Sequence, residues 1–130
     1  MADKRLADKR RILIVEDDLD TIHLLEQIVM GAGYEPILAR GGEEGLRLLQ
    51  EEGADLVLLD LVMRGVDGWM LLETVKAESR FSPIPVIIIS ARHPREDPTR
   101  ISIHADMFED YFTKPFEVTE LVARLQELLQ

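Results

Sequence analysis

The sequence predicts an α/β fold in which helices cover both faces of a parallel β-sheet. Short apolar runs rich in Val, Ile and Leu are typical of strands that are buried on both faces. Segments with apolar residues at helical spacing separate these runs, and the alternation repeats five times without an internal sequence repeat. Such alternation favours right-handed connections, and a chain of 130 residues has the length of one domain.

The first half of the chain contains three of the predicted strands. The first and third contain continuous apolar runs, and the second is shorter; the segments between them begin after acidic or glycine residues and end at glycine. The predicted elements are a strand at 11–15, a helix with Asp20 as its N-cap, a strand at 35–39, a helix at 43–52 and a strand at 56–60.

The second half continues the pattern, with one irregular segment. Its predicted elements are a helix from about 69 to 78, a strand at 85–90, a short strand at 111–113 and a helix at 118–130. Between the last two strands, Pro94 and Pro98 interrupt any long helix, because proline is tolerated only in the first helical turn. We therefore expect a short or displaced fourth helix after Pro98.

Composition narrows the classes of function. A net charge of −10 argues against direct binding to nucleic acid, which needs a basic face. The absence of cysteine excludes disulfides and thiolate metal sites, and no apolar run is long enough to cross a bilayer. The charged N-terminus does not resemble a signal peptide, so we expect a cytoplasmic protein. Residues 1–10 predict a flexible leader, with a partner-binding arm as the alternative, before a folded domain at 11–130.

Polar side chains follow four of the predicted strands. Glu16 and Asp17 follow the first strand, and Asp60 closes the third; Ser90 and Lys114 follow the fourth and fifth. The carboxyl ends of parallel strands meet at one edge, so three carboxylates would crowd together there. Oxygen ligands without His or Cys select Mg²⁺ or Mn²⁺. With Ser90 and Lys114, such a metal would surround a phosphoryl group bonded to Asp60.

Four motifs in this order resemble the receiver domain of bacterial two-component response regulators, including the chemotaxis receivers. They are ILIVEDD at 12–18, DLVLLDLVMRGVDG at 55–68, PVIIISA at 85–91 and YFTKPF at 111–116. The resemblance covers the chain from about Arg11 to its end. It implies a flavodoxin-like (βα)5 sandwich with the five strands in the order 2-1-3-4-5.

The resemblance also implies roles for the residues at the sheet edge. Asp60 is expected to accept the phosphoryl group. The metal would be held by Asp60, by Asp17 directly, by Glu16 through water and by the backbone carbonyl of Val62. Lys114 is the expected phosphoryl-binding lysine, and the peptide bond before Pro115 is expected to be cis.

Ser90 and Tyr111 match the switch pair of the family. The implied function is a signalling switch that accepts a phosphoryl group from a histidine kinase or phosphotransfer protein. It would catalyse only its own phosphorylation and slow dephosphorylation, without turning over an external substrate. A downstream effector, or a second copy of the chain bound through the fourth helix, fifth strand and fifth helix, would read the change.

Particular residues bear on two other functions. A receiver-like binding module that works without phosphate is favoured by Arg64, which stands where the family usually has proline, and by the unusual segment 93–110. A hydrolase of the haloacid dehalogenase type needs a second aspartate two residues after the nucleophile, where this chain has Val62.

We also expect Trp69 to be a packing residue. The three histidines are expected at the surface or its boundary: His23, His93 and His104.

Overall fold

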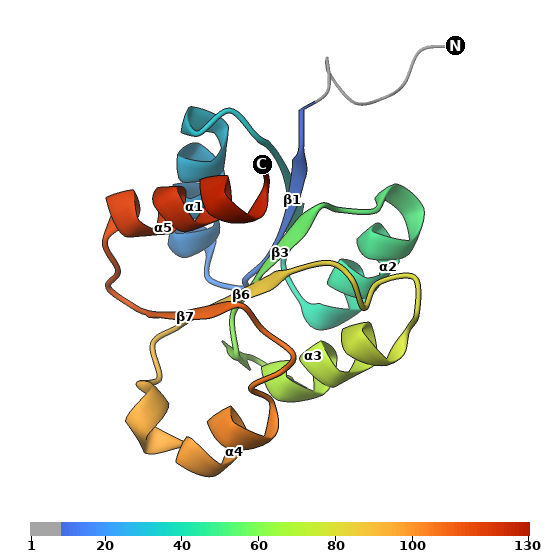
Figure 1. Ribbon diagram of the computed structural model, residues 1–130, viewed down its shortest axis with the longest axis vertical. Helices are drawn as coiled ribbons and strands as arrows, with labels where there is room; N and C mark the ends of the chain where they lie inside the picture. The colour runs from blue at the N-terminus through green and yellow to red at the C-terminus, as the bar shows by residue number, and fades with distance from the viewer. Residues whose placement is uncertain (1–8) are drawn as a thin grey trace.

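A computed structural model describes residues 9–130 and contains the predicted sheet of five parallel strands (Figure 1). The strands lie in the order β2-β1-β3-β6-β7, which is 2-1-3-4-5 when the five are counted along the chain. The flavodoxin-like topology is therefore confirmed. Their bounds are β1 (Arg11–Val15), β2 (Glu35–Ala39), β3 (Leu56–Leu59), β6 (Val86–Ser90) and β7 (Asp110–Thr113).

Helices cover both faces of this sheet (Figure 1). One face is covered by α1 (Leu19–Gly31) and α5 (Val118–Leu128), and the other by α2 (Gly42–Glu52) and α3 (Gly68–Ala77). The two layers explain why β1, β3 and β6 are buried at every position, and apolar except at Arg11 and Ser90, because successive side chains point to opposite faces and both faces are covered. These three central strands hold the functional edge described below.

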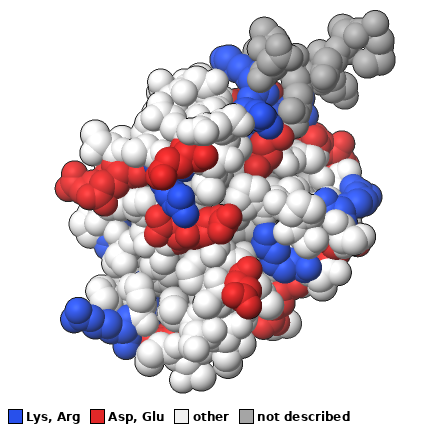
Figure 2. Space-filling model, in the orientation of Figure 1, with Lys and Arg blue, Asp and Glu red and all other residues white. Residues whose placement is uncertain are grey.

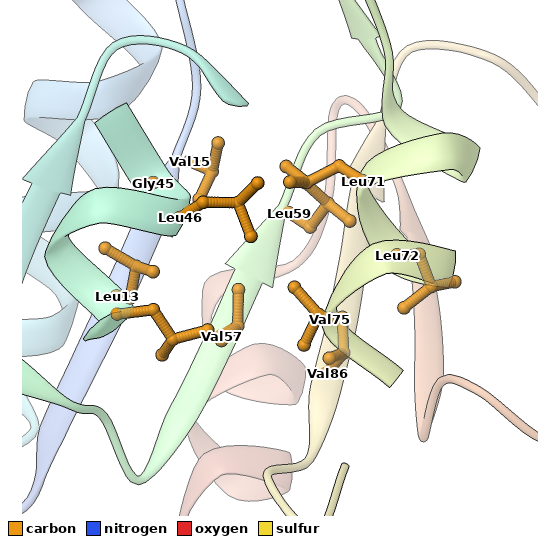
Figure 3. Close-up of a pocket in the computed structure, with 11 residues that line it drawn as sticks. Leu13, Val15, Gly45, Leu46, Val57, Leu59, Leu71, Leu72, Val75 and Val86 are labelled. Atoms are coloured by element: carbon orange, nitrogen blue, oxygen red, sulfur yellow. The ribbon is translucent and has the colours of Figure 1, made fainter. Parts of the chain in front are cut away.

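The core between α2, α3 and the sheet is closely packed (Figure 3). Eleven residues enclose a space of about 10 Å³, no more than one water molecule needs. Gly45 permits this packing, since a Cβ at that position would lie 3.1 Å from Val15 Cγ2. The hollow is a packing seam and is too small for an organic ligand.

The irregular segment before β7 contains a short fourth helix, as predicted. A 3₁₀ turn, η1 (Pro94–Glu96), precedes α4 (Pro98–Ile103), in which Pro98 occupies the first turn. The prediction for His104 was wrong, because this side chain is buried beside α3. Its ring stacks on Trp69 with the ring centroids 4.6 Å apart, and its Nε2 lies 2.6 Å from the carboxylate of Glu73. Trp69 is a buried packing residue, as expected.

Several predicted limits need correction. The N-cap of α1 is Asp18 and not Asp20, because the Asp18 carboxylate accepts the Thr21 backbone N–H at 2.9 Å. The last helix, predicted at 118–130, ends at Leu128, and Leu129 is its buried C-cap. The loop after β3 contains an unpredicted hairpin of β4 (Val62–Met63) and β5 (Val66–Asp67).

The predicted leader, residues 1–10, lies outside the described residues except for Lys9 and Arg10. Within the described chain, no helix combines the length and apolarity needed to cross a bilayer.

Candidate functional site

Three carboxylates meet at the carboxyl edge of the sheet, and we call Glu16, Asp17 and Asp60 the carboxylate edge. Each offers an oxygen within 4.8 Å of the others. The backbone fixes this meeting, because Glu16 N–H donates to Ala39 and Asp60 N–H donates to Val15, each at 3.0 Å, so both residues continue the ladders of the sheet. Glu16 and Asp60 are only 1% and 5% exposed. Their charges are therefore poorly screened by solvent.

Lys114 is the cation that the fold places among these carboxylates. Its Nζ lies 2.7 Å from Glu16 Oε1 and 3.3 Å from Asp60 Oδ2. The backbone positions it, since Lys114 N–H donates to the Ser90 carbonyl at 2.8 Å and the peptide bond to Pro115 is cis. Lys114 thus faces two of the three carboxylates, and negative charge remains in excess at this edge.

Burial and the ion pairs of the site shift the pKa values of Glu16 and Lys114. Burial raises the pKa of Glu16 to about 7, although the Lys114 ammonium and the Asp18 backbone N–H oppose the rise. Burial alone would lower the pKa of Lys114, but the hydrogen bond to Glu16 and the charge of Asp60 outweigh it and raise that pKa above its ordinary value. Lys114 is thus a permanent positive charge at this edge.

Asp60 is held at both carboxylate oxygens. Its Oδ1 accepts the Val62 backbone N–H at 3.1 Å, and its Oδ2 faces Lys114. The start of α3 packs directly on this loop, because a Cβ at Gly68 would lie 2.5 Å from the Cα of Leu61. Only glycine permits that approach. The Asp60 carboxylate therefore lies at the start of a short loop that is fixed from both sides.

Ser90 and Tyr111 are joined through the backbone of Arg92. Ser90 Oγ accepts the Arg92 N–H at 3.1 Å, and the Tyr111 hydroxyl donates to the Arg92 carbonyl at 2.5 Å. Burial raises the pKa of Tyr111, and a hydrogen bond with Ser90 opposes the rise. Ser90 is fully buried at the end of β6, next to the carboxylate edge. A change at Ser90 can therefore reach Tyr111 through one peptide segment.

Two arginines contact Asp17, the outermost of the three carboxylates. The Arg64 backbone N–H donates to Asp17 Oδ2 at 2.8 Å, with its guanidinium Nε 3.6 Å from the same oxygen. Arg40 donates instead to the Asp17 backbone carbonyl at 3.2 Å. Sequence reasoning placed a cation at Arg64 but missed Arg40, whose only signal is its position directly after β2.

The donor set fits a hard divalent cation. Glu16, Asp17 and Asp60 supply oxygen ligands only, and two of them are buried, which distinguishes them from ordinary surface acids. Lys114 and the exposed Arg64 leave these three carboxylates with negative charge that a divalent cation would neutralise. These three residues are the ones that could hold it.

The face formed by α5 and β7 is acidic. Figure 2 shows Asp and Glu side chains gathered over α5, and the one arginine whose ion pairs join these elements, Arg124, is matched by Asp110 and Glu127. Such a face repels the phosphates of nucleic acid.

Comparisons with known proteins agree with this geometry. A sequence model of the response regulator receiver domain matches residues 12–126. The chain is 39% identical over 115 residues to the uncharacterised transcriptional regulatory protein YrkP of Bacillus subtilis, covering 88% of this chain and 47% of YrkP. It is 35% identical over 122 residues to the phosphate regulon regulator PhoB of Escherichia coli, covering 93% of this chain and 52% of PhoB. The chain thus spans about half the length of these relatives.

Solved structures share the fold. The signal receiver domain of a signal transduction histidine kinase from Syntrophus aciditrophicus matches with a TM-score of 0.83 and 31% identity, over 92% of this chain and 89% of that one. The chemotaxis protein CheY4 of Vibrio cholerae matches with a TM-score of 0.83 over 93% of this chain and 99% of that one. At 23% identity, the latter likeness concerns the fold alone.

Proposed function

The chain belongs to the response regulator receiver domain family, and from this premise we propose that it is a signalling switch turned on by transfer of a phosphoryl group to Asp60. The observation that carries the proposal is the placement of Asp60. Its buried carboxylate lies 3.3 Å from Lys114 and shares the carboxylate edge with Glu16 and Asp17. The folded domain proposed for this role is residues 11–130.

The proposed reaction is attack by an Asp60 carboxylate oxygen on the phosphorus of a phosphohistidine. A P–O bond to Asp60 forms, and the P–N bond to the donor imidazole breaks. Lys114 already points at Asp60, so its ammonium offsets charge on the transferring group without reorganising. The chain acts as the acceptor in this step and turns over no external substrate.

Glu16, Asp17 and Asp60, with the Val62 carbonyl, are the residues proposed to hold Mg²⁺ or Mn²⁺. When bound, the metal would neutralise phosphoryl oxygen charge. The contact of Lys114 with Glu16, at 2.7 Å, would hold its positive charge in place beside the phosphoryl group. Val62 N–H would continue to orient the Asp60 carboxylate from the opposite side.

The proposed relay runs through Ser90, Arg92 and Tyr111. Ser90 Oγ accepts a hydrogen bond in the unphosphorylated protein, so its own hydroxyl hydrogen remains available to a phosphoryl oxygen. Movement of Ser90 toward that oxygen would pull on the Arg92 peptide segment and break the bond from Tyr111. Tyr111 would then turn inward and alter the surface of α4, β7 and α5.

The proposed partners follow from this surface and from the relatives. A histidine kinase or phosphotransfer protein would donate the phosphoryl group. A downstream effector, or a second copy bound through α4, β7 and α5, would read the altered surface. Because the chain spans about half of YrkP and PhoB, an attached output domain is one form that the effector can take.

The test is intact mass spectrometry after incubation with acetyl phosphate and Mg²⁺. We expect a gain of one phosphoryl group that is absent without Mg²⁺ and absent in Asp60→Asn. Asp106→Asn is the matched control, because Asp106 is an exposed aspartate beyond α4, and it should label like the wild type. Persistent labelling of Asp60→Asn would place the acceptor elsewhere.

A phosphate-independent binding module is the second candidate, favoured by Arg64 at Asp17 and by the short α4. Absence of both the mass gain and a beryllofluoride complex would select it.

A further inference from the structure

Arg64 makes two contacts with the same oxygen of Asp17. The backbone N–H lies 2.8 Å from Asp17 Oδ2, and the guanidinium Nε lies 3.6 Å from it. The Arg64 side chain is 91% exposed, while the Asp17 side chain is only 20% exposed. The Arg64 charge therefore lies on the solvent side of Asp17, whereas a metal held by the carboxylate edge would contact Asp17 from the side of Glu16 and Asp60.

The turn between β4 and β5 places this contact. Met63 pairs with Val66, so Arg64 and Gly65 form a two-residue hairpin turn, with Gly65 at φ +72°. Proline is common at the first central position of a turn whose second is glycine at positive φ. A proline there would supply neither the N–H nor the guanidinium, since proline has no backbone hydrogen. The residue type at position 64 thus decides whether Asp17 has an internal partner.

We propose that Arg64 competes with the divalent cation for Asp17 and so raises the Mg²⁺ concentration at which the site fills. This inference rests on the proposed function, since it concerns the metal of that same site. The guanidinium lowers affinity by pairing with Asp17 in the metal-free state and by repelling the cation in the bound state. The backbone N–H adds a second competing interaction at the same oxygen.

Arg40 does not share this role. Its contact is with the Asp17 backbone carbonyl, which leaves the carboxylate untouched. Both arginines line the open hollow at the mouth of the site, with Leu19 and Val62. Solvent and ions therefore reach Asp17 past the Arg64 guanidinium, and the pair can exchange with a cation without any rearrangement of the core.

The expected effects are modest, because exposed ion pairs are weak and screened by salt. Removing the guanidinium in Arg64→Ala should tighten Mg²⁺ binding about two- to fivefold at low salt. Arg64→Lys keeps a positive charge and should remain close to the wild type. Arg64→Pro removes the N–H as well, so its affinity should exceed that of Arg64→Ala. Salt should reduce the affinity difference between the wild type and Arg64→Ala. It should not change the difference between Arg64→Ala and Arg64→Pro, since the N–H carries no net charge.

The experiment is titration calorimetry with Mg²⁺ alone, at low and at high NaCl, on the full chain and these three variants. Arg47→Ala is the matched control, because Arg47 is an exposed arginine on α2 that pairs with Glu51 and should leave the Mg²⁺ affinity unchanged. Thermal unfolding of Arg64→Pro checks that the hairpin change leaves the domain folded, and Arg64→Ala carries the test if it does not.

The outcomes separate this inference from the proposed function. Asp17→Ala should lose Mg²⁺ binding; if it binds like the wild type, the proposed metal site itself is wrong. If Asp17→Ala loses binding while Arg64→Ala matches the wild type, only the competition by the guanidinium is overturned. Weaker binding in Arg64→Ala would also overturn it, by making Arg64 a support of the site.

Discussion

At the carboxylate edge Glu16 and Asp60 share the Lys114 ammonium while Asp17 pairs with an exposed arginine, whereas between α3 and α4 each charged side chain has a partner of its own. We call the second group the α3–α4 contact, and it consists of Asp67, Trp69, Glu73, Arg100 and His104. There Arg100 Nη1 lies 3.0 Å from Asp67 Oδ2, and His104 Nε2 lies 2.6 Å from Glu73 Oε2. The first region keeps unbalanced charge that a ligand can use, and the second uses its charges to join two helices.

The same difference appears in the buried groups. Lys114 lies between two carboxylates, with Asp60 the more distant one at 3.3 Å. His104 has a hydrogen-bond partner at each ring nitrogen, with Nδ1 2.7 Å from the Arg100 carbonyl and Nε2 2.6 Å from Glu73 Oε2. Neutralising Asp60 should therefore stabilise the protein, whereas removing the ring of Trp69 or His104 should destabilise it.

The largest expected effect is that of Trp69→Ala at the α3–α4 contact. Trp69 is 3% exposed and stacks on His104, with Phe108 6.3 Å away between ring centroids. Losing a buried tryptophan costs about 3–5 kcal/mol of unfolding free energy. Urea unfolding followed by circular dichroism measures it, with Met70→Ala, a 64% exposed neighbour, as the near-neutral control. A loss below about 1 kcal/mol would mean that this contact does not hold α4.

His104→Ala should lower the unfolding free energy by about 2 kcal/mol, because it removes a buried stack and leaves the Arg100 carbonyl without its side-chain partner. His104→Phe keeps a ring against Trp69 and should restore about half of that loss. Urea unfolding of both variants separates stacking from hydrogen bonding. Equal losses in the two variants would assign the whole effect to the hydrogen bonds.

These two regions also differ in how much of their structure can be predicted from the sequence. The strands at 11–15 and 35–39 have the predicted limits. The first is a continuous apolar run after Arg11, which has few other stable arrangements, and the second lies between Gly33 and the glycine pair at 41–42. Glu16, Asp17 and Asp60 meet at one edge because the ends of parallel strands must do so.

The rest depends on contacts between distant segments. His104 pairs with a residue 31 positions away, and no local pattern indicates that α4 approaches α3 closely enough to bury it. The choice of Asp18 over Asp20 as N-cap depends on where the chain leaves β1, because both residues are aspartates and either could cap a helix. The hairpin of β4 and β5 is too short for any periodicity to predict.

Asp60→Asn, measured without divalent cations, should raise the unfolding free energy by about 1 kcal/mol. Asparagine keeps the side-chain shape and the acceptor for Val62 N–H, while one of three neighbouring negative charges disappears. Lys114 retains its shorter contact with Glu16 at 2.7 Å. Urea unfolding tests the sign, with exposed Asp106→Asn as the control. A loss of stability would show that the Lys114–Asp60 pair outweighs the repulsion, and the contrast between the two regions would fail.

The smallest expected effect is that of the Arg100–Asp67 pair. The two side chains are 46% and 35% exposed, so their attraction is screened and should contribute about 0.2–1 kcal/mol. Arg100 also lies 3.9 Å from Asp97, and Asp67 caps α3 through the Trp69 N–H, so single substitutions remove more than the pair. A double-mutant cycle with Arg100→Ala and Asp67→Asn isolates the pair, because asparagine keeps the cap. If the coupling energy falls to zero in high salt, His104 and Trp69 are the groups that join α4 to α3. If the coupling persists in high salt, the surface pair of Arg100 and Asp67 also holds the two helices together.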